Sequence, residues 1–388
     1  MSTPSNYLKT PADRGTGITW TPEYIAWAET SADYGDTRTG VDLCSRLISD
    51  GKIKGDLDTR SDALLYSPVE FLASGDRRRS AQAVKALDAN EDFWLSYPEQ
   101  ELRLIHQWGL LAGWAVAQAK WVYQGGRYTP IWQYVPNRAV RWDWPKRQWI
   151  FRESIGADDG TFRDVPITPG DGRWMLYTPF GSDRPWIYGL WRALSRLYLL
   201  KQYGIADWGN YSDRQGSGTK VVTGFEGTEA ARTKLTTEMA ALGRNASMVL
   251  RKEWDYKLVE SVARTWEGFQ AQIKLVDTAA SSTILGQDIA TGASSTAGTA
   301  KERVTVKRTI SDASTLGTTL REHGFKPWAF HNWGDENLAP WVGWDVEEPG
   351  DEMEDASVVQ MACQAFASLK NVGAVFDEKA FLERFDIK

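Results

Sequence analysis

Cysteine and histidine are both scarce in this chain of 388 residues. The two cysteines, Cys44 and Cys363, lie near opposite ends of the sequence, which excludes a disulfide framework and favours a reducing compartment. The three histidines, His106, His323 and His331, show no metal-ligand spacing. We therefore expect no metal site and no cofactor.

Long apolar runs and nucleotide-binding motifs are also missing. No segment approaches the roughly 18 to 20 apolar residues of a membrane span, and the first residues lack the apolar segment of a signal peptide. Residues 216–220, GSGTK, lack the spacer and the Lys-Ser/Thr ending of a phosphate-binding loop, and no G-x-S-x-G motif occurs. We expect neither a membrane partner nor an enzymatic activity.

Charge is unevenly distributed along the chain. The net charge is −6, but residues 333–388 carry 13 acidic and 4 basic side chains, which leaves residues 1–332 at +3. The carboxylates of residues 347–355 do not follow the spacing of a calcium loop. A dedicated high-affinity DNA-binding protein would be clearly basic, so the chain is better suited to meeting DNA without holding it.

Tryptophan, by contrast, is abundant, with 20 residues. Large cores and subunit interfaces both use Trp. Exposed indoles at Trp142, Trp144 and Trp149 would also suit sugar binding, with a carboxylate pair elsewhere. A carbohydrate-binding or carbohydrate-active protein is therefore the alternative hypothesis.

Patterning divides the chain into a helical and a sheet-rich part. Residues 1–39 contain Pro, Gly and Thr clusters and predict an irregular arm. Helical periodicity follows, and residues 123–186 then combine aromatic and β-branched side chains with tight-turn signals, which is typical of an antiparallel sheet. These elements predict an α+β protein.

Two amphipathic helices follow the sheet region. The first has apolar residues at helical spacing, namely Leu190, Trp191, Leu194, Leu197 and Tyr198. Residues 209–260 predict a small β-α-β insert, and a second long helix follows it. A later helical segment is expected to end at Gly324, with Pro327 beyond it.

A strip of small residues separates these later helices. Residues 291–300 are only Thr, Gly, Ala and Ser, so burial offers nothing to offset the entropy of ordering them. Basic residues follow at Lys301, Arg303, Lys307 and Arg308. On a helix, 303 and 307 share one face and 301 and 308 another, so they form no single phosphate-tracking stripe.

Three stretches together resemble the Mu-like family of tailed-bacteriophage portal proteins. Residues 50–71, DGKIKGDLDTRSDALLYSPVEF, are similar to that family's early D-x-x-I-x-x-x-L-x-x-R-x-x-A-L segment. Residues 281–304, SSTILGQDIATGASSTAGTAKERV, are similar to its I-L-G-Q followed by a Thr/Gly/Ser-rich run. Residues 366–388 are similar to its closing L-x-x-x-G and short amphipathic helix.

The resemblance implies a portal fold with a wing, two stem helices, a small α/β clip, a tunnel loop and a helical crown. The implied boundaries are an N-terminal extended arm (1–39), the wing of helices and antiparallel sheet (40–185), stem helix 1 (186–208), the clip (209–260), stem helix 2 (261–285), the tunnel loop (286–300), a wing or tunnel-lining helix with its connection (301–346), and an acidic helical crown (347–388).

The resemblance also implies which residues meet DNA. The DNA-facing residues of the tunnel loop would be Gln287, Asp288, Thr291, Gly292, Ser294, Ser295, Thr296, Gly298 and Thr299. The basic residues Lys301, Arg303, Lys307 and Arg308 would be candidates for the channel wall. Small uncharged groups would slide over phosphates, whereas added Lys or Arg would hold them.

The implied function is that of a head–tail connector at one capsid vertex. A ring of about twelve subunits, packed partly through Trp, would conduct double-stranded DNA non-specifically during packaging and ejection. The implied partners are further copies of the chain, the terminase, the major capsid protein and head–tail adaptor proteins. The protein would reside in the virion, and in the host cytoplasm during assembly.

Overall fold

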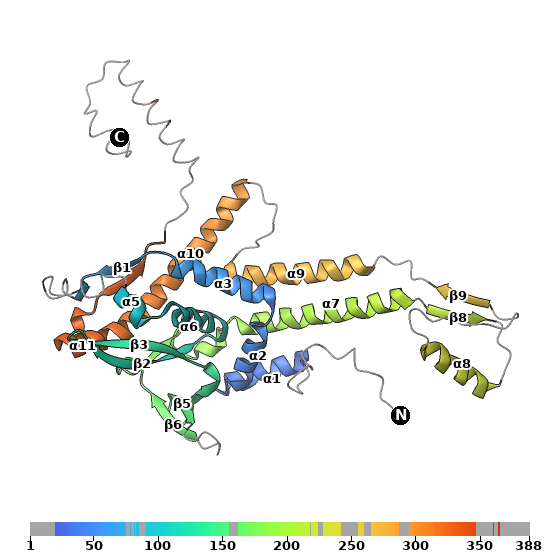
Figure 1. Cartoon of the computed structure of the whole chain (residues 1–388), viewed down its shortest axis with the longest axis horizontal. Coiled ribbons are helices and arrows are strands. Elements are labelled where there is room, and N and C mark those ends of the chain that lie inside the picture. The colour runs from blue at the N-terminus through green and yellow to red at the C-terminus, as the bar shows by residue number, and fades with distance from the viewer. Residues whose placement is uncertain are drawn as a thin grey trace.

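The computed structural model of the chain describes residues 20–74, 78, 81, 83–84, 91–154, 162–217, 219–223, 228–241, 255–259, 265–286, 295–346, 360 and 364. The molecule is elongated. A body of helices and small sheets lies at one end, and two long helices run from it to a small α/β unit at the other end (Figure 1). Across the described ranges, no helix has both the length and the apolar character needed to cross a bilayer.

The described chain opens with three helices, α1 (Pro22–Asp33), α2 (Arg38–Leu47) and α3 (Gly51–Leu65). Thr21 caps α1 by accepting a hydrogen bond from the Tyr24 N–H at 3.1 Å, and Pro22 occupies its first turn. The apolar side of α1 is buried at Ile25, Ala28 and Ala32. The prediction of an extended arm over residues 1–39 is therefore wrong for α1, because this burial stabilises a helix; residues 1–19 lie outside the described part.

Among the described residues, the body holds three antiparallel sheets. One has the strand order β3 (Arg127–Val135), β2 (Ala115–Gln124), β7 (Trp174–Tyr177), and the second has the order β4 (Val140–Asp143), β5 (Gln148–Ser154), β6 (Phe162–Ile167). The third pairs β1 (Val69–Leu72) with β10 (Trp341–Trp344). Short helical elements α5 (Glu91–Ser96), α6 (Glu99–Ala112) and η2 (Asn137–Ala139) accompany them. The predicted antiparallel strands are present, and β10 brings a late segment back to pair with β1, so the α+β class is confirmed.

Tryptophan builds the interior of this body. The buried indoles are Trp20, Trp114, Trp132, Trp149, Trp174, Trp186, Trp191, Trp328 and Trp344. They belong to two apolar clusters, one around α1, α2 and the root of the long helices, the other around α6 and the later helices. These indoles fill the core of a single subunit, so the expected role of Trp in packing between subunits is wrong for them.

The two long helices, α7 (Trp191–Ser217) and α9 (Thr265–Leu285), lie side by side (Figure 1). Lys201 of α7 joins them by ion pairs of 2.7 Å to Asp277 and 2.9 Å to Asp50, the N-cap of α3. The long hairpin is thereby fixed to the first helices of the body.

The bounds of these helices differ from the prediction. The first helix was expected over residues 186–208, but η3 (Pro185–Ile187) is a separate 3₁₀ turn and α7 begins at Trp191. The helix then continues to Ser217, and Tyr211 packs against Phe269 of α9 with ring centroids 5.9 Å apart. The second helix was expected over residues 261–285; α9 ends at Leu285 as predicted and begins at Thr265.

A small α/β unit joins α7 to α9. Strand β8 (Thr219–Thr223) pairs antiparallel with β9 (Asp255–Val259), and α8 (Glu229–Ala241) lies between them in the sequence. The β-α-β order matches the prediction for residues 209–260, although residues 209–217 belong to α7.

A long helical segment crosses the body after α9. It comprises α10 (Ser295–Thr319), the π-helical turn η4 (Leu320–Phe325) and α11 (Lys326–Trp333), with η5 (Glu336–Leu338) before β10. The prediction that this helix ends at Gly324 is wrong. Gly324 lies inside the π turn, where a Cβ would sit 2.1 Å from the Tyr97 hydroxyl, so glycine fits this close contact within a continuing helix. Pro327 is tolerated in the first turn of α11. The predicted crown, residues 347–388, lies outside the described residues apart from positions 360 and 364.

Candidate functional site

The candidate site is the junction where α9 ends and α10 begins, on either side of the predicted tunnel loop. The predicted loop residues that lie outside the described part of the chain are Gln287, Asp288, Thr291, Gly292 and Ser294. The structure therefore defines the two ends of the loop, at Gly286 and at Ser295.

The far end of the predicted loop is helical. Residues 295–300, which include Ser295, Thr296, Gly298 and Thr299, form the first turns of α10, and Lys301 and Arg303 continue the same helix. The loop boundary at residue 300 is therefore wrong. Extending an existing helix costs less than nucleating one, so the good helix formers after Ala300 can carry the helix back through weaker residues.

Gly286 ends α9 in a left-handed conformation. Its φ is +82° and its N–H donates to the Ser282 carbonyl at 3.0 Å. A Cβ here would lie 2.5 Å from Nε of Arg308. Both the backbone angle and this close approach require glycine, so the turn out of α9 is fixed by its sequence.

Arg308 of α10 reaches back to the end of α9. Its Nη1 donates to the Thr283 carbonyl at 2.9 Å and to the Ile284 carbonyl at 3.0 Å. These are final carbonyls of a helix, which lack intrahelical partners and attract positive charge. Burial and the neighbouring Arg60 lower the pKa of Arg308. The Arg308 guanidinium is therefore bonded to the end of α9, and its place in the channel wall stays a prediction.

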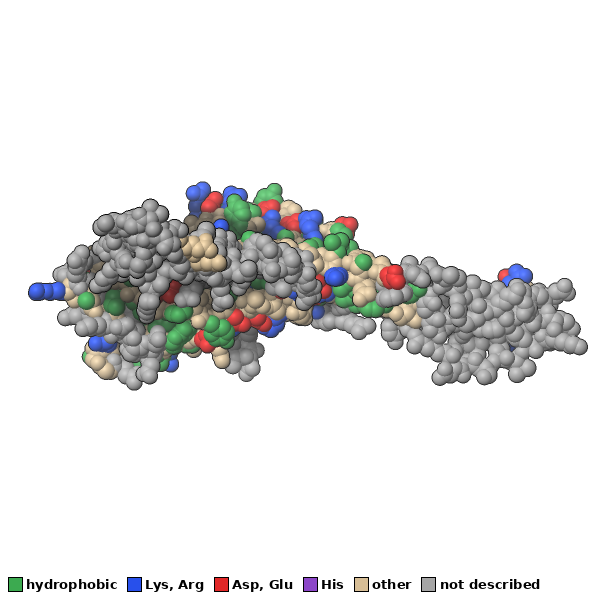
Figure 2. All heavy atoms as spheres, turned by 90° about the horizontal axis from the view of Figure 1, so that it is seen from above, with side chains coloured by type: hydrophobic (Ala, Val, Ile, Leu, Met, Phe, Trp, Pro, Cys, Tyr) green, Lys and Arg blue, Asp and Glu red, His purple; other side chains and the backbone are tan. Residues whose placement is uncertain are grey.

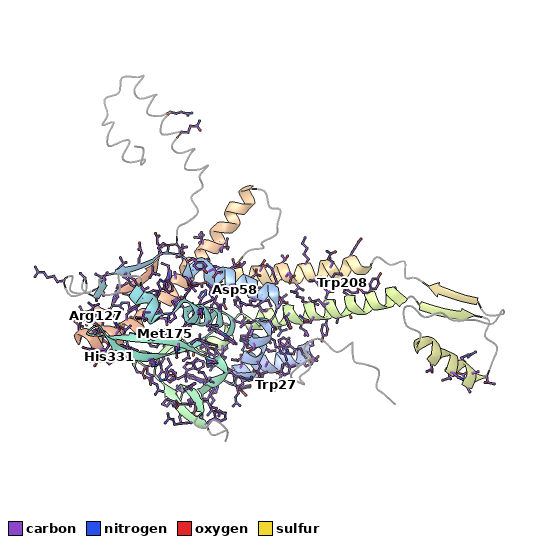
Figure 3. All side chains as sticks on the ribbon, viewed as in Figure 1. Trp27, Asp58, Arg127, Met175, Trp208 and His331 are labelled. Atoms are coloured by element: carbon purple, nitrogen blue, oxygen red, sulfur yellow. The ribbon has the colours of Figure 1, made fainter. Side chains whose placement is uncertain are left out.

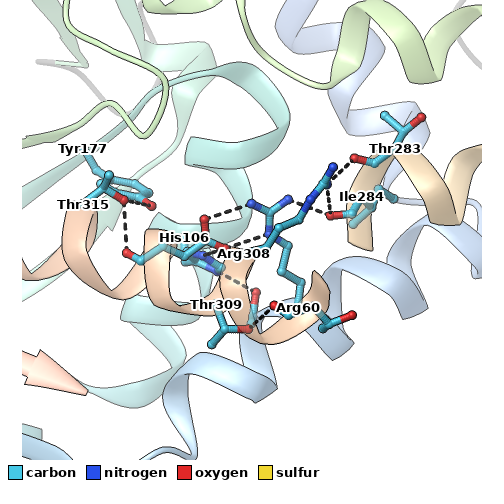
Figure 4. A network of polar contacts seen from close by, with 11 residues as sticks. Arg60, His106, Tyr177, Thr283, Ile284, Arg308, Thr309 and Thr315 are labelled. Atoms are coloured by element: carbon cyan, nitrogen blue, oxygen red, sulfur yellow. Dashed lines mark hydrogen bonds and ion pairs between the residues drawn. The ribbon is translucent and has the colours of Figure 1, made fainter. Parts of the chain in front are cut away.

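Arg60 of α3 makes the second link to this junction. Its Nε and Nη2 donate to the two carboxylate oxygens of Asp312 at 2.7 and 2.9 Å, and its Nη1 donates to the Ile284 carbonyl at 2.7 Å (Figure 4). Arg60 and Asp312 are both buried. The planar guanidinium thus joins α3, α9 and α10 through one side chain.

His106 completes the polar network from α6. Its Nε2 lies 3.3 Å from Oδ2 of Asp312, and its Nδ1 lies 3.0 Å from Oγ of Ser61. Burial raises the pKa of Asp312, but hydrogen bonds from His106 and Arg60 outweigh this and lower the pKa to about 2. The Asp312 carboxylate is therefore ionised, and it is compensated on two sides.

This network of polar contacts has a structural role: it fixes helices to one another. Two guanidinium groups cap the end of α9, and Arg60 also joins α10 to the body at Asp312, so the α9 end of the intervening loop is held (Figure 4). Within the described ranges, no group of three or more His, Cys, Asp or Glu side chains could hold a metal ion. Ser61, His106 and Asp312 lie in line, but Ser61 and His106 are 0% exposed and Asp312 is 4% exposed, so the hydroxyl is closed to a substrate.

Lys307 is the one predicted basic channel residue whose side chain is described and exposed. On the face shown in Figure 2, Lys and Arg side chains lie beside Asp and Glu, and the described residues form no continuous basic stripe. A surface of this kind does not track a phosphate backbone by charge.

Comparison with known protein families identifies the family of the chain that carries this junction. A family model described as the portal protein of Mu bacteriophage matches residues 41–387. The chain belongs to this portal family. The resemblance carried by residues 50–71, 281–304 and 366–388 is thereby confirmed, and the chain is a portal protein, a structural component of phage particles. No curated protein matches it.

Solved structures share the fold of this portal chain. A chain of the virion of a native gene transfer agent particle is 11% identical, with a TM-score of 0.53, covering 95% of the portal chain and 99% of that chain. A chain of the neck of a native gene transfer agent particle, computed with C12 symmetry, is 10% identical, with a TM-score of 0.53, covering 94% and 99%. The chain thus shares the fold of these particle chains.

The carbohydrate alternative has no support in this portal structure. Trp149 is 5% exposed, and its ring packs 5.5 Å from Trp142 and 5.4 Å from Trp186. Trp144 also packs against Trp142, at 6.2 Å. The three indoles proposed as sugar platforms form one packed cluster, because their apolar area is used in the core.

The portal junction depends on residues to which the sequence assigned no role there, namely Arg60, His106 and Asp312. Arg60 is the Arg of the family segment at residues 50–71. Arg60 lies three positions after the buried Leu57 and seven after the buried Ile53, so it is a charged residue on the apolar face of α3. A charged residue on an apolar helix face indicates a buried ion pair, and this pattern is visible in the sequence. Nothing in the sequence indicates that Asp312 is its partner, because 252 positions separate them.

Proposed function

We propose that twelve copies of this chain form a ring around a channel, and that the ring is the head–tail connector through which double-stranded DNA enters and leaves the capsid. The twelvefold count is supported by the shared fold with a neck computed with C12 symmetry. A closed ring of identical subunits uses two different faces of each subunit, one of which meets the other face of the next copy.

Exposed apolar side chains on the two long helices support such contacts. On α7, Leu200, Ile205 and Trp208 are 44%, 40% and 39% exposed, and Leu275 of α9 is 67% exposed. Figure 3 shows Trp208 on this hairpin, well away from the packed interior around Met175. Apolar groups of this size at the surface of a helix pair are suited to burial against a neighbouring subunit.

The α9–α10 junction is the observation that carries the proposal of a DNA channel. The first turns of α10 project from the body on the side opposite to β5 and β6 (Figure 1). We assign this projecting side to the channel, with α7 and α9 as the stem, the β8–α8–β9 unit as the clip and residues 287–294 as the tunnel loop. A firm base would allow small polar loop residues to meet moving DNA while the ring keeps its shape.

Charge in the loop offers a direct test of DNA contact. The double variant Thr291→Lys with Ser294→Lys should slow DNA packaging into capsids, and the effect should weaken as salt rises, because added cations bind phosphates. The matched control is Thr291→Gln with Ser294→Gln, which adds bulk without charge. Equal packaging rates for the two double variants would contradict a loop that faces DNA. Lys301, Arg303, Lys307 and Arg308 remain candidates for the channel wall.

The ring would also be a platform for other proteins. We propose that a separate terminase supplies the energy for packaging, that the clip side meets terminase and head–tail adaptor proteins, and that the body meets the major capsid protein. Assembly would take place in the host cytoplasm, and the chain itself would have a structural and not a catalytic role. The acidic residues 347–388 would face packaged DNA and repel it.

Solution mass tests the ring itself. The purified 43.6 kDa chain should elute as an assembly of about twelve subunits, and negative-stain images should show rings with a central hole. A closed ring with another number of subunits would change the proposed subunit number and leave the proposed ring in place. A chain that stays monomeric even when produced together with its capsid protein would contradict the proposal.

A further inference from the structure

The body and the stem meet at a joint with almost no spare room. Gly113, at the end of α6, has a φ of +91°, and a Cβ there would lie 2.1 Å from the Pro185 carbonyl oxygen. A Cβ on Gly40 of α2 would lie 3.1 Å from the ring of Trp191, the first residue of α7. Close packing of this kind normally leaves no cavity.

One small cavity is nevertheless present at the joint. Counted as the space open to the centre of a water molecule, its volume is about 10 Å³. It is lined by Thr37, Trp114 and Trp186 together with apolar groups of α1, α2, α6 and α7. This volume corresponds to about one water molecule, which is stable in a cavity when it has at least two polar partners.

The three polar side chains that line this cavity have unused hydrogen-bonding atoms. Thr37 Oγ1, Trp114 Nε1 and Trp186 Nε1 are buried without a partner among the described residues. The residues themselves are 2%, 0% and 2% exposed. Buried polar atoms are normally paired, so three unpaired atoms around one cavity point to a shared ligand.

The conformation of Thr37 supports the same conclusion. Threonine before a helix commonly caps it by accepting a hydrogen bond from an N–H of the first turn. Thr37 precedes α2 but has a helical backbone, with φ −83° and ψ −6°, and its side chain caps nothing. Its hydroxyl is therefore available to the cavity.

We infer that this cavity binds one water molecule. The water oxygen accepts a hydrogen bond from each indole N–H, and one of its hydrogens is donated to Thr37 Oγ1. This arrangement matches the two acceptor sites of water and one of its donors. A halide ion would also accept from the indoles, but it is larger than water and would place a charge among apolar groups with no cation in the lining.

The water would join three parts of the chain that are distant in sequence. Thr37 precedes α2, Trp114 lies between α6 and β2, and Trp186 lies in the turn before the stem helix α7. The site would hold the first helices, the sheet and the root of the stem together. The water site depends only on packing within one subunit, so its test is independent of ring formation and of DNA passage.

A structure of the full chain at a resolution that shows ordered water tests this site. A single solvent peak should lie about 2.7–3.2 Å from all three atoms. The peak should persist in Thr37→Ser, which keeps the hydroxyl, and be weakened in Thr37→Val, which leaves only the two indole donors. The absence of a peak in the unsubstituted protein would overturn the assignment, as would an anomalous peak at the site in crystals grown with bromide.

Thermal unfolding gives a second readout. Thr37→Val should unfold at a lower temperature than Thr37→Ser, because it removes a partner of the water. An equal or higher unfolding temperature would count against the site. If Thr37→Val does not fold, Trp186→Phe removes one donor instead; a weakened peak is expected, and an unchanged peak would contradict a site with three partners.

Discussion

The body and the stem use their large apolar side chains in opposite ways. In the body, Trp114, Trp132 and Trp174 are at most 1% exposed. Along the stem, Leu275 is 67% exposed and Trp208 is 39% exposed. The body is therefore stabilised by its own interior, whereas the stem presents apolar surface that a neighbouring subunit can cover.

Within the body, charged pairs differ in how far they are buried. Arg60 and Asp312 form a buried pair in which every polar atom is directed at a named partner, while Lys54 and Asp58 on the same helix form an exposed pair. Removing one member of a buried pair leaves an uncompensated charge, whereas exposed pairs contribute little. Substitutions can thus separate what holds the subunit together from what holds the ring together.

The largest effect is expected in the core of the body. Trp174→Ala should lower the free energy of unfolding of the subunit by about 3–5 kcal/mol, because it removes a buried indole that packs against Phe151 and leaves a cavity. Trp27→Ala, at a side chain that is 57% exposed, should change it by at most about 0.5 kcal/mol. Urea unfolding compares the two, and equal losses would refute the assignment of Trp174 to the core.

A loss of about 3–5 kcal/mol is also expected for Arg60→Ala, because Asp312 would remain buried without its bidentate partner. The control is Lys54→Ala on the same helix, whose exposed pair with Asp58 should be worth less than about 1 kcal/mol. Arg60→Lys should lie between them, because it keeps the charge without the fork geometry. An Arg60→Ala subunit as stable as Lys54→Ala would show that the network does not hold the junction.

Acid should weaken the same network. The pKa of Asp312 falls from 3.8 to about 2 in the folded chain, so its contribution to stability is complete above the unfolded value and is lost as the pH falls from about 4 through about 2. At about 1.4 kcal/mol per pH unit, the difference is worth about 2 kcal/mol. Unfolding followed at several pH values should show a shallower acid slope in Asp312→Asn, and an unchanged slope would contradict an ionised Asp312.

The smallest effect on subunit stability is expected on the stem. Leu275→Gln should change the free energy of unfolding by at most about 0.5 kcal/mol, because the side chain is already mostly exposed. It should nevertheless reduce the fraction of protein found in rings, as measured by solution mass. Leu275→Met, which keeps the apolar surface, should assemble normally. Normal assembly of Leu275→Gln would remove this residue from the proposed interface.

Local patterns in the sequence predicted much of the architecture. The spacing of Leu190, Leu194 and Leu197 indicated the first stem helix, and the β-α-β insert and antiparallel strands followed from residue type and turn signals. Boundaries were less accurate where long-range packing decides them. Tyr211 packs against α9 in the extended part of α7, and Gly324, where a helix end was expected, lies in a π turn packed closely against Tyr97.

The candidate site was less predictable than the fold. The small-residue strip located the loop, but the residues that hold its α9 end come from α3 and α10. Arg308 was predicted at the channel wall, and a pattern of basic residues gives no sign that its guanidinium also caps α9. The pairing of Arg60 with Asp312 arises only when α3 and α10 pack together.

Cryo-electron microscopy of the assembled protein tests the central claim most directly. The account predicts a closed ring in which the α9–α10 junction borders the central channel, Leu275 lies within the assembly, and β5 and β6 lie on the outer side. A ring whose α9–α10 junction lies at the outer rim, away from the channel, would contradict it.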